Sequence, residues 1–171
     1  MKKPKLNIVT LGCSKNKVDS EHLAASLSHC YDIMHDSDKK SDVVIINTCG
    51  FIGDAKEESI DTILEYAELR KTNKIKKLYV MGCLSQRYRK DLQEEIHEVD
   101  GFFGVESVSL IASQIQNLTD YQVLKYNPER LLSTPSHYAY LKISEGCNRR
   151  CAFCAIPLIR GEHVSVPMEN L

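Results

Sequence analysis

Short apolar runs alternate with amphipathic segments over the first 120 residues of the chain. The runs predict strands at residues 6–11, 31–34, 42–47, 77–81 and 101–105. The third run is a continuous β-branched stretch, which is typical of a strand buried on both faces. Apolar residues recur at helical spacing in residues 18–28, 54–69, 86–95 and 108–116. The alternation predicts an α/β fold with a parallel sheet flanked by helices.

A polar stretch that contains Pro128 and Pro135 interrupts this pattern. We interpret residues 1–120 as an α/β domain, residues 121–136 as a linker and residues 137–171 as the start of a second domain. A new strand is predicted at residues 138–143. It leads directly into a cluster of cysteines.

Composition and charge narrow the class of protein. The chain has 171 residues, 43% of them hydrophobic, which suits a soluble globular domain. Lys plus Arg is 22 and Asp plus Glu is 23, so no global basic field indicates nucleic-acid binding. No apolar run approaches the ~20 residues of a membrane span. The N-terminus lacks the apolar core of a signal peptide, so a cytoplasmic protein without membrane contact is expected.

The chain has seven cysteines, an odd number that disfavours a fully paired disulfide framework. Three of them follow the spacing Cys147-x-x-x-Cys151-x-x-Cys154. Three thiolates on one loop can bind three irons of a cubane cluster and leave the fourth iron open for a ligand. The alternative is a zinc site completed by His163, which we favour less because that histidine lies outside standard finger spacings.

Three other cysteines each follow a predicted strand and each adjoin a glycine. They are Cys13, Cys49 and Cys83, beside Gly12, Gly50 and Gly82. The carboxyl ends of parallel strands share one edge of a sheet, so these thiols are expected to converge there as metal ligands. The alternative is a set of buried structural thiols, which are common in cores. Cys30 lies outside both sets and is expected in the core.

The C-terminal set, with Phe153 before its last cysteine, resembles the signature of the radical S-adenosylmethionine superfamily. The resemblance implies that the open iron binds S-adenosylmethionine. It also implies that Phe153 lies near the adenine of that cofactor. The alternative for Phe153 is a simple core aromatic.

Residues 12–21, 47–52, 55–60 and 82–88 resemble the methylthiotransferase family within that superfamily. They look like the branch that modifies an aspartate on the twelfth protein of the small ribosomal subunit, and residues 155–161 fit that branch too. The tRNA-modifying branch, the closest alternative, typically has Gln-Met at Ser14-Lys15 and lacks Phe-Ile after the second cysteine. One departure is Val166, where the family usually has Arg after the serine.

This resemblance implies two 4Fe-4S clusters. Cys13, Cys49 and Cys83 would hold an auxiliary cluster, and Cys147, Cys151 and Cys154 the radical-generating one. It implies transfer of a methylthio group to the β-carbon of the aspartate, a small-subunit ribosomal protein as substrate, and flavodoxin or ferredoxin as electron donor. It further implies that residues 137–171 are the first strand and cluster loop of a truncated radical-SAM α/β barrel. The chain alone is therefore expected to be inactive. The oligomeric state does not follow from the sequence, although a monomer is expected.

Several polar residues near the cysteines have two possible roles each. Asn16, Asp19 and Asn47 could hydrogen-bond cluster sulfurs or neighbouring loops, although we favour a helix cap for Asp19, and Asn47 could close a turn. Arg149, Arg150 and Arg160 could pair with substrate carboxylates or with neighbouring acids, and the sequence does not decide.

Two other protein classes are weaker alternatives. An electron-transfer iron–sulfur protein uses four cysteines per cluster rather than three. A nucleotide-binding module needs a glycine-rich phosphate loop, which residues 11–15 do not supply.

Overall fold

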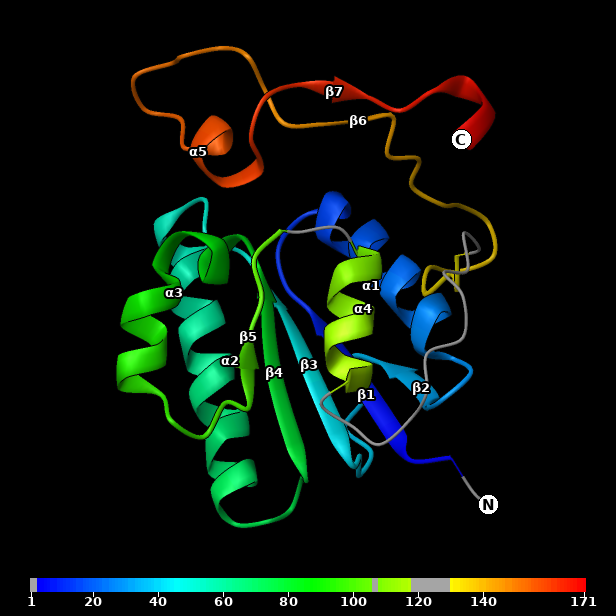
Figure 1. Ribbon diagram of the computed structural model, residues 1–171, viewed down its shortest axis with the longest axis vertical. Coiled ribbons are helices and arrows are strands. Elements are labelled where there is room, and N and C mark those ends of the chain that lie inside the picture. Colours follow the sequence, from blue (N-terminus) through cyan, green and yellow to red (C-terminus); the bar gives the residue numbers. More distant parts are fainter. Residues whose placement is uncertain (1–2, 106–107, 118–129) are drawn as a thin grey trace.

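The computed structural model describes residues 3–105, 108–117 and 130–171. Its main body is a five-stranded parallel sheet in the order β2-β1-β3-β4-β5 (Figure 1). The strands are β1 (Lys5–Thr10), β2 (Asp32–His35), β3 (Val43–Thr48), β4 (Lys77–Gly82) and β5 (Gly101–Phe102). The predicted α/β fold with a parallel sheet is therefore confirmed, although β5 is shorter than expected.

Helices cover both faces of the sheet, as Figure 1 shows. One face carries α1 (Ser14–Leu27) and α4 (Val108–Asn117), and the other carries α2 (Gly53–Lys71) and α3 (Cys83–Glu95). Alternate residues of β3 serve the two cores: Ile45 packs in the cluster with α1 and α4, and Ile46 in the cluster with α2 and α3. Because β3 is buried on both faces, its sequence is a continuous apolar run.

The buried face of α2 is narrower than the apolar pattern of its sequence predicts. Ile63 and Ala67 are buried, as expected for residues on one side of the helix. Ile60 and Leu64, which share that apolar stripe, are 38% and 47% exposed. They line a groove between α2 and α3, which is also lined by Tyr88, the residue at which α3 is kinked.

Strand order reverses between β1 and β3, since the chain first adds β2 on one side of β1 and then crosses to the other side. Ligands of open α/β sheets bind at such a switch point, beyond the carboxyl ends of the strands. Cys13 follows β1 and Cys49 follows β3, so both lie at this position.

The C-terminal segment lies across the carboxyl edge of the sheet (Figure 1). It contains β6 (Ser144–Glu145), α5 (Ile156–Arg160), β7 (Val164–Ser165) and a 3-10 turn, η1 (Met168–Asn170). The strand predicted at residues 138–143 is wrong, because these residues form neither helix nor strand. Leu141 and Ile143 stay about 60% exposed, and no strand of the described chain runs parallel to them to bury their side chains. Instead, β6 pairs with β7 in an antiparallel ribbon.

The predicted linker falls partly on residues 121–129, which lie outside the described residues. Residues 130–136 have no regular structure but are anchored by Glu21, a fully buried carboxylate of α1. Glu21 accepts hydrogen bonds from Arg130 Nε at 3.0 Å and from the Ser133 amide at 2.8 Å. In the described part of the chain, no helix is long and apolar enough to cross a membrane.

Candidate functional site

Two of the three strand-end cysteines stand at the start of a helix. Cys13 is the N-cap of α1, and Cys83 is the first residue of α3. Both helices begin several residues earlier than predicted, because the chain turns directly from strand into helix at the glycine before each cysteine. Amide groups at a helix N-terminus favour negative charge, which suits a thiolate ligand at this position.

The three cysteine loops pack directly against one another. A Cβ added to Gly12 would lie 2.5 Å from Cys49 Cβ and 2.8 Å from Cys49 Sγ. A Cβ added to Gly50 would lie 2.7 Å from the amide nitrogen of Leu84, the residue after Cys83. The first loop therefore contacts the second, and the second contacts the third. The expected convergence of these cysteines at the sheet edge is present in the structure.

Glycine is required at two of these turns for conformation as well as space. Gly12 and Gly82 have φ of +86° and +99°, which disfavour residues with a Cβ. A Cβ on Gly82 would also lie 2.5 Å from Asn47 Oδ1. Each turn therefore delivers the following cysteine from the end of its strand to the shared edge.

Two buried asparagines hold the loops together. Asn16 Nδ2 donates to the carbonyl of Leu11 at 2.9 Å and to that of Thr48 at 3.1 Å. Asn47 Nδ2 donates to the carbonyl of Asn16 at 2.9 Å and to Ser20 Oγ at 3.0 Å. Asn47 thus binds α1 instead of closing a turn. Asn16 Oδ1 lies 4.0 Å from Cys83 Sγ, so the amide network reaches the thiols as well.

The thiols of Cys13, Cys49 and Cys83 differ in exposure, and their environment shifts the pKa of Cys83. Cys49 and Cys83 are buried, whereas Cys13 is exposed, and all seven cysteines are free. Burial raises the pKa of the Cys83 thiol, because its thiolate loses hydration. The Arg160 guanidinium opposes that rise in pKa, while Cys49 and Cys13 add to it through like-charge repulsion. Iron ions carry positive charge and would therefore stabilise a thiolate at Cys83.

The donor set of the first site consists of three free cysteine thiols on loops that are in direct contact. An all-thiol donor set is the kind that iron–sulfur clusters use. The residues present therefore fit an iron–sulfur cluster.

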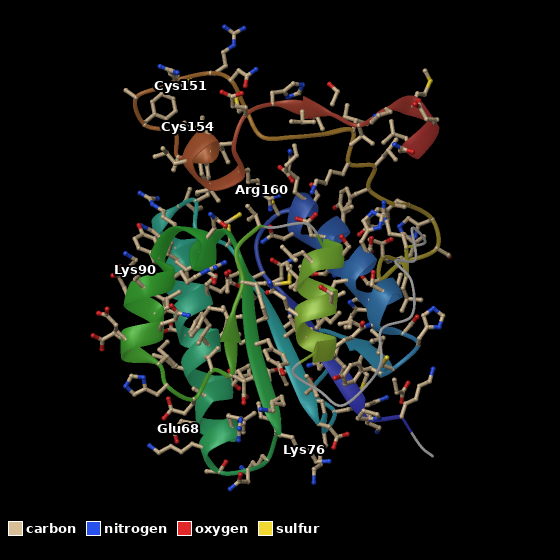
Figure 2. All side chains as sticks on the ribbon, in the orientation of Figure 1. Glu68, Lys76, Lys90, Cys151, Cys154 and Arg160 are labelled. Atoms are coloured by element: carbon tan, nitrogen blue, oxygen red, sulfur yellow. The ribbon has the colours of Figure 1, made fainter. Side chains whose placement is uncertain are left out.

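The second cysteine set lies on one loop above the sheet edge, where Figure 2 labels Cys151 and Cys154. The Cys154 amide donates to the Cys151 carbonyl at 3.1 Å, and the Cys147 amide donates to the Gly161 carbonyl at 3.0 Å. The Arg149 amide donates to Cys147 Sγ at 3.4 Å. Amide hydrogen bonds to sulfur stabilise cluster thiolates, so this loop also fits an iron–sulfur cluster.

Phe153 and His163 flank the second set. Phe153 is 92% exposed and is therefore not a core aromatic; its role near an adenine stays a prediction. The His163 ring lies 3.3 Å from Ser165 Oγ, and its backbone amide donates to Asn148 Oδ1 at 2.8 Å. Cys30 is buried in the core cluster that contains α1, as predicted.

The favoured helix cap for Asp19 is wrong, because α1 begins at Ser14 and Asp19 lies inside it. Its carboxylate pairs with Lys142 at 2.6 Å and with Arg160 at 3.3 Å. Arg160 thus pairs with a neighbouring acid, whereas Arg149 and Arg150 are exposed.

Sequence reasoning missed Lys142 and Glu145, which complete this ion network. Asp19 and its two partners are more than 120 residues apart in the chain. No local spacing therefore signals the pairing.

Curated relatives match the whole chain. The ribosomal protein uS12 methylthiotransferase RimO of Phocaeicola vulgatus is 53% identical over 173 residues, which cover 100% of this chain and 39% of the relative. The protein of the same name from Cytophaga hutchinsonii is 53% identical, over 99% of this chain and 38% of the relative. That from Porphyromonas gingivalis is 51% identical, over 100% and 39%. The chain thus spans about two fifths of the length of these relatives.

A family model described as "Uncharacterized protein family UPF0004" matches residues 5–104. The match runs from the start of β1 to the loop after β5, so it contains the complete sheet and all three strand-end cysteines. Because it covers more than half of the residues, the chain belongs to the UPF0004 family.

Proposed function

We propose that this chain is part of a radical-SAM methylthiotransferase that modifies an aspartate of ribosomal protein uS12. The observation that carries the proposal is the packing of the Cys13, Cys49 and Cys83 loops at the switch point of the sheet, beneath a second three-cysteine loop. Relatives named uS12 methylthiotransferases support the substrate, since 53% of the aligned residues are identical over almost the whole length of this chain.

Each cysteine set would hold one 4Fe-4S cluster, with Cys13, Cys49 and Cys83 on the auxiliary one and Cys147, Cys151 and Cys154 on the other. When bound, the clusters would supply a site for the transferred sulfur and the electron that cleaves S-adenosylmethionine. The protein groups around them have separate tasks. Gly12 and Gly82 set the approach of the thiols, and the Arg149 amide supports the Cys147 sulfur.

Phe153 is the side chain of the second loop that we assign to the cofactor. Its ring is almost entirely accessible, so one face is available to stack on an adenine. The proposal includes a cytoplasmic location, because uS12 belongs to the ribosome. It includes flavodoxin or ferredoxin as the electron donor, because the second cluster needs an external electron. It also includes a monomeric state.

The test is anaerobic turnover by the protein that carries this chain. It is reconstituted with iron and sulfide and incubated with S-adenosylmethionine, a low-potential reductant and uS12, and the product is read by peptide mass spectrometry. One methylthio group in place of one hydrogen on a single aspartate is expected, with the Cys13→Ala variant as the inactive control. Modification of tRNA adenosine in place of uS12 would overturn the substrate and assign the sister activity.

A further inference from the structure

A buried arginine joins the C-terminal segment to the first cysteine set. Arg160 ends α5, and only 3% of its side chain is exposed. Figure 2 labels it between that segment and the strand ends. Nη2 donates to Asn16 Oδ1 at 2.6 Å, and Nη1 donates to Glu145 Oε2 at 2.7 Å. A guanidinium held on several fixed acceptors is oriented rather than free to move.

The same guanidinium is linked through Asn16 to a predicted cluster ligand, Cys83. Its positive charge opposes the rise in the pKa of the Cys83 thiol that burial causes. Asn16 Oδ1, which accepts from Arg160, is also the oxygen 4.0 Å from Cys83 Sγ. Asn16 therefore joins the guanidinium to the Cys83 thiol by a shared oxygen, within a buried group of polar side chains.

The surrounding charges leave the positive charge of Arg160 available to sulfur. Two carboxylates, Asp19 and Glu145, face the guanidinium. Lys142 pairs with both, at 2.6 Å and 2.5 Å, and Lys15 pairs with Glu145 at 3.3 Å. Three cations thus share two carboxylates. The group therefore carries one positive charge more than its carboxylates neutralise, and cysteines that are deprotonated as cluster ligands would supply the matching negative charge.

We propose that Arg160 is a positioning residue that docks the second cysteine loop onto the sheet and stabilises the negative charge of the cluster held by Cys13, Cys49 and Cys83. The inference rests on the proposed function only for the presence of that cluster. Hydrogen bonds to cluster sulfurs and nearby positive charge raise the reduction potential of such groups. Because α5 follows directly after Cys154, one side chain also fixes the distance between the two sets.

The docking role is tested on the metal-free chain by amide hydrogen exchange. Arg160→Gln is expected to increase exchange across residues 144–161, while the exchange of β3 and β4 stays unchanged. The matched control is Lys90→Gln, which removes one positive charge from the exposed side of α3, the helix that Cys83 begins. Unchanged exchange in Arg160→Gln would overturn the docking role.

The charge role is tested by a redox titration followed by electron paramagnetic resonance. The parent carries Ala at Cys147, Cys151 and Cys154, so that only the first cluster is observed. Arg160→Gln is expected to shift the midpoint potential to a more negative value, whereas Arg160→Lys and Lys90→Gln keep the potential of the parent. Loss of iron from the Gln variant with retention in the Lys variant supports the same role.

Other outcomes contradict the charge role. Equal potentials in Arg160→Gln and the parent overturn it, and so does an equal shift, or equal loss of iron, in the Gln and Lys variants. Absence of iron from the parent itself is a failure of the proposed function. The hydrogen-exchange result of the metal-free chain then still decides the docking role.

Discussion

The substitution Gly12→Ala tests the close approach of the cysteine loops most sharply. Gly12 has a φ of +86°, and a Cβ there would lie 2.5 Å from Cys49 Cβ. Alanine therefore faces two costs: a backbone conformation that disfavours side chains, and a contact that only movement of Cys49 or of the turn can relieve. Both costs fall on the loops that carry the first cysteine set.

The magnitude follows from these two costs. A left-handed backbone conformation costs a residue with a Cβ about 1–2 kcal/mol. Forced rearrangement of a packed contact typically costs about 1–3 kcal/mol more. We therefore expect Gly12→Ala to lower the free energy of unfolding by about 2–5 kcal/mol and to reduce iron binding by the first set.

The assay is urea unfolding of the reduced, metal-free chain, followed by circular dichroism. The control is Gly53→Ala at the start of α2, where a Cβ meets nothing within 4 Å. This variant is expected to gain up to ~1 kcal/mol, because alanine favours helix. A change within about 0.5 kcal/mol for Gly12→Ala, the range of an ordinary surface substitution, would refute the close packing of the loops.

Three further predictions concern the residues that anchor the site. Glu21→Gln removes the buried charge that binds Arg130, so the free energy of unfolding is expected to fall by about 3–5 kcal/mol and residues 130–136 to become sensitive to trypsin; unchanged digestion would count against the anchor. Gly82→Ala, whose Cβ would meet Asn47 Oδ1, is expected to destabilise the chain as much as Gly12→Ala in the same urea assay, whereas wild-type stability would contradict the geometry of that turn. Burial alone would raise the pKa of Glu145, but Lys142 and Arg160 outweigh it and lower the pKa to about 2 from 4.5. The ionised form therefore adds stability that is complete above pH 4.5 and lost as the pH falls towards 2, and Glu145→Gln is expected to flatten this part of the pH–stability curve.

The sequence was sufficient to predict the sheet and the first cysteine set. An apolar run such as residues 43–46 signals a buried strand, and parallel strands bring their carboxyl ends to one edge whatever lies between them. The convergence of Cys13 and Cys49 follows from that topology. The glycine beside each cysteine marked the close contacts, because only a residue without a Cβ fits there.

The ion network around Arg160 was not predictable in the same way. Asp19 and Arg160 are 141 residues apart, and their pairing depends on how the C-terminal segment crosses the sheet edge. Local rules also gave the wrong role to Asp19, since α1 begins at Ser14 rather than at Val18 and this residue therefore lies inside the helix. The strand expected at residues 138–143 did not form for a related reason: a short apolar segment becomes a strand only beside another strand.

The most direct test of the two-cluster account is the amount of iron and acid-labile sulfide per chain after anaerobic reconstitution. The account predicts about eight irons, and about four when either Cys13, Cys49 and Cys83 or Cys147, Cys151 and Cys154 are replaced by alanine. About four irons in the wild-type chain, lost only with the second set, would contradict it and leave the strand-end cysteines with a structural role.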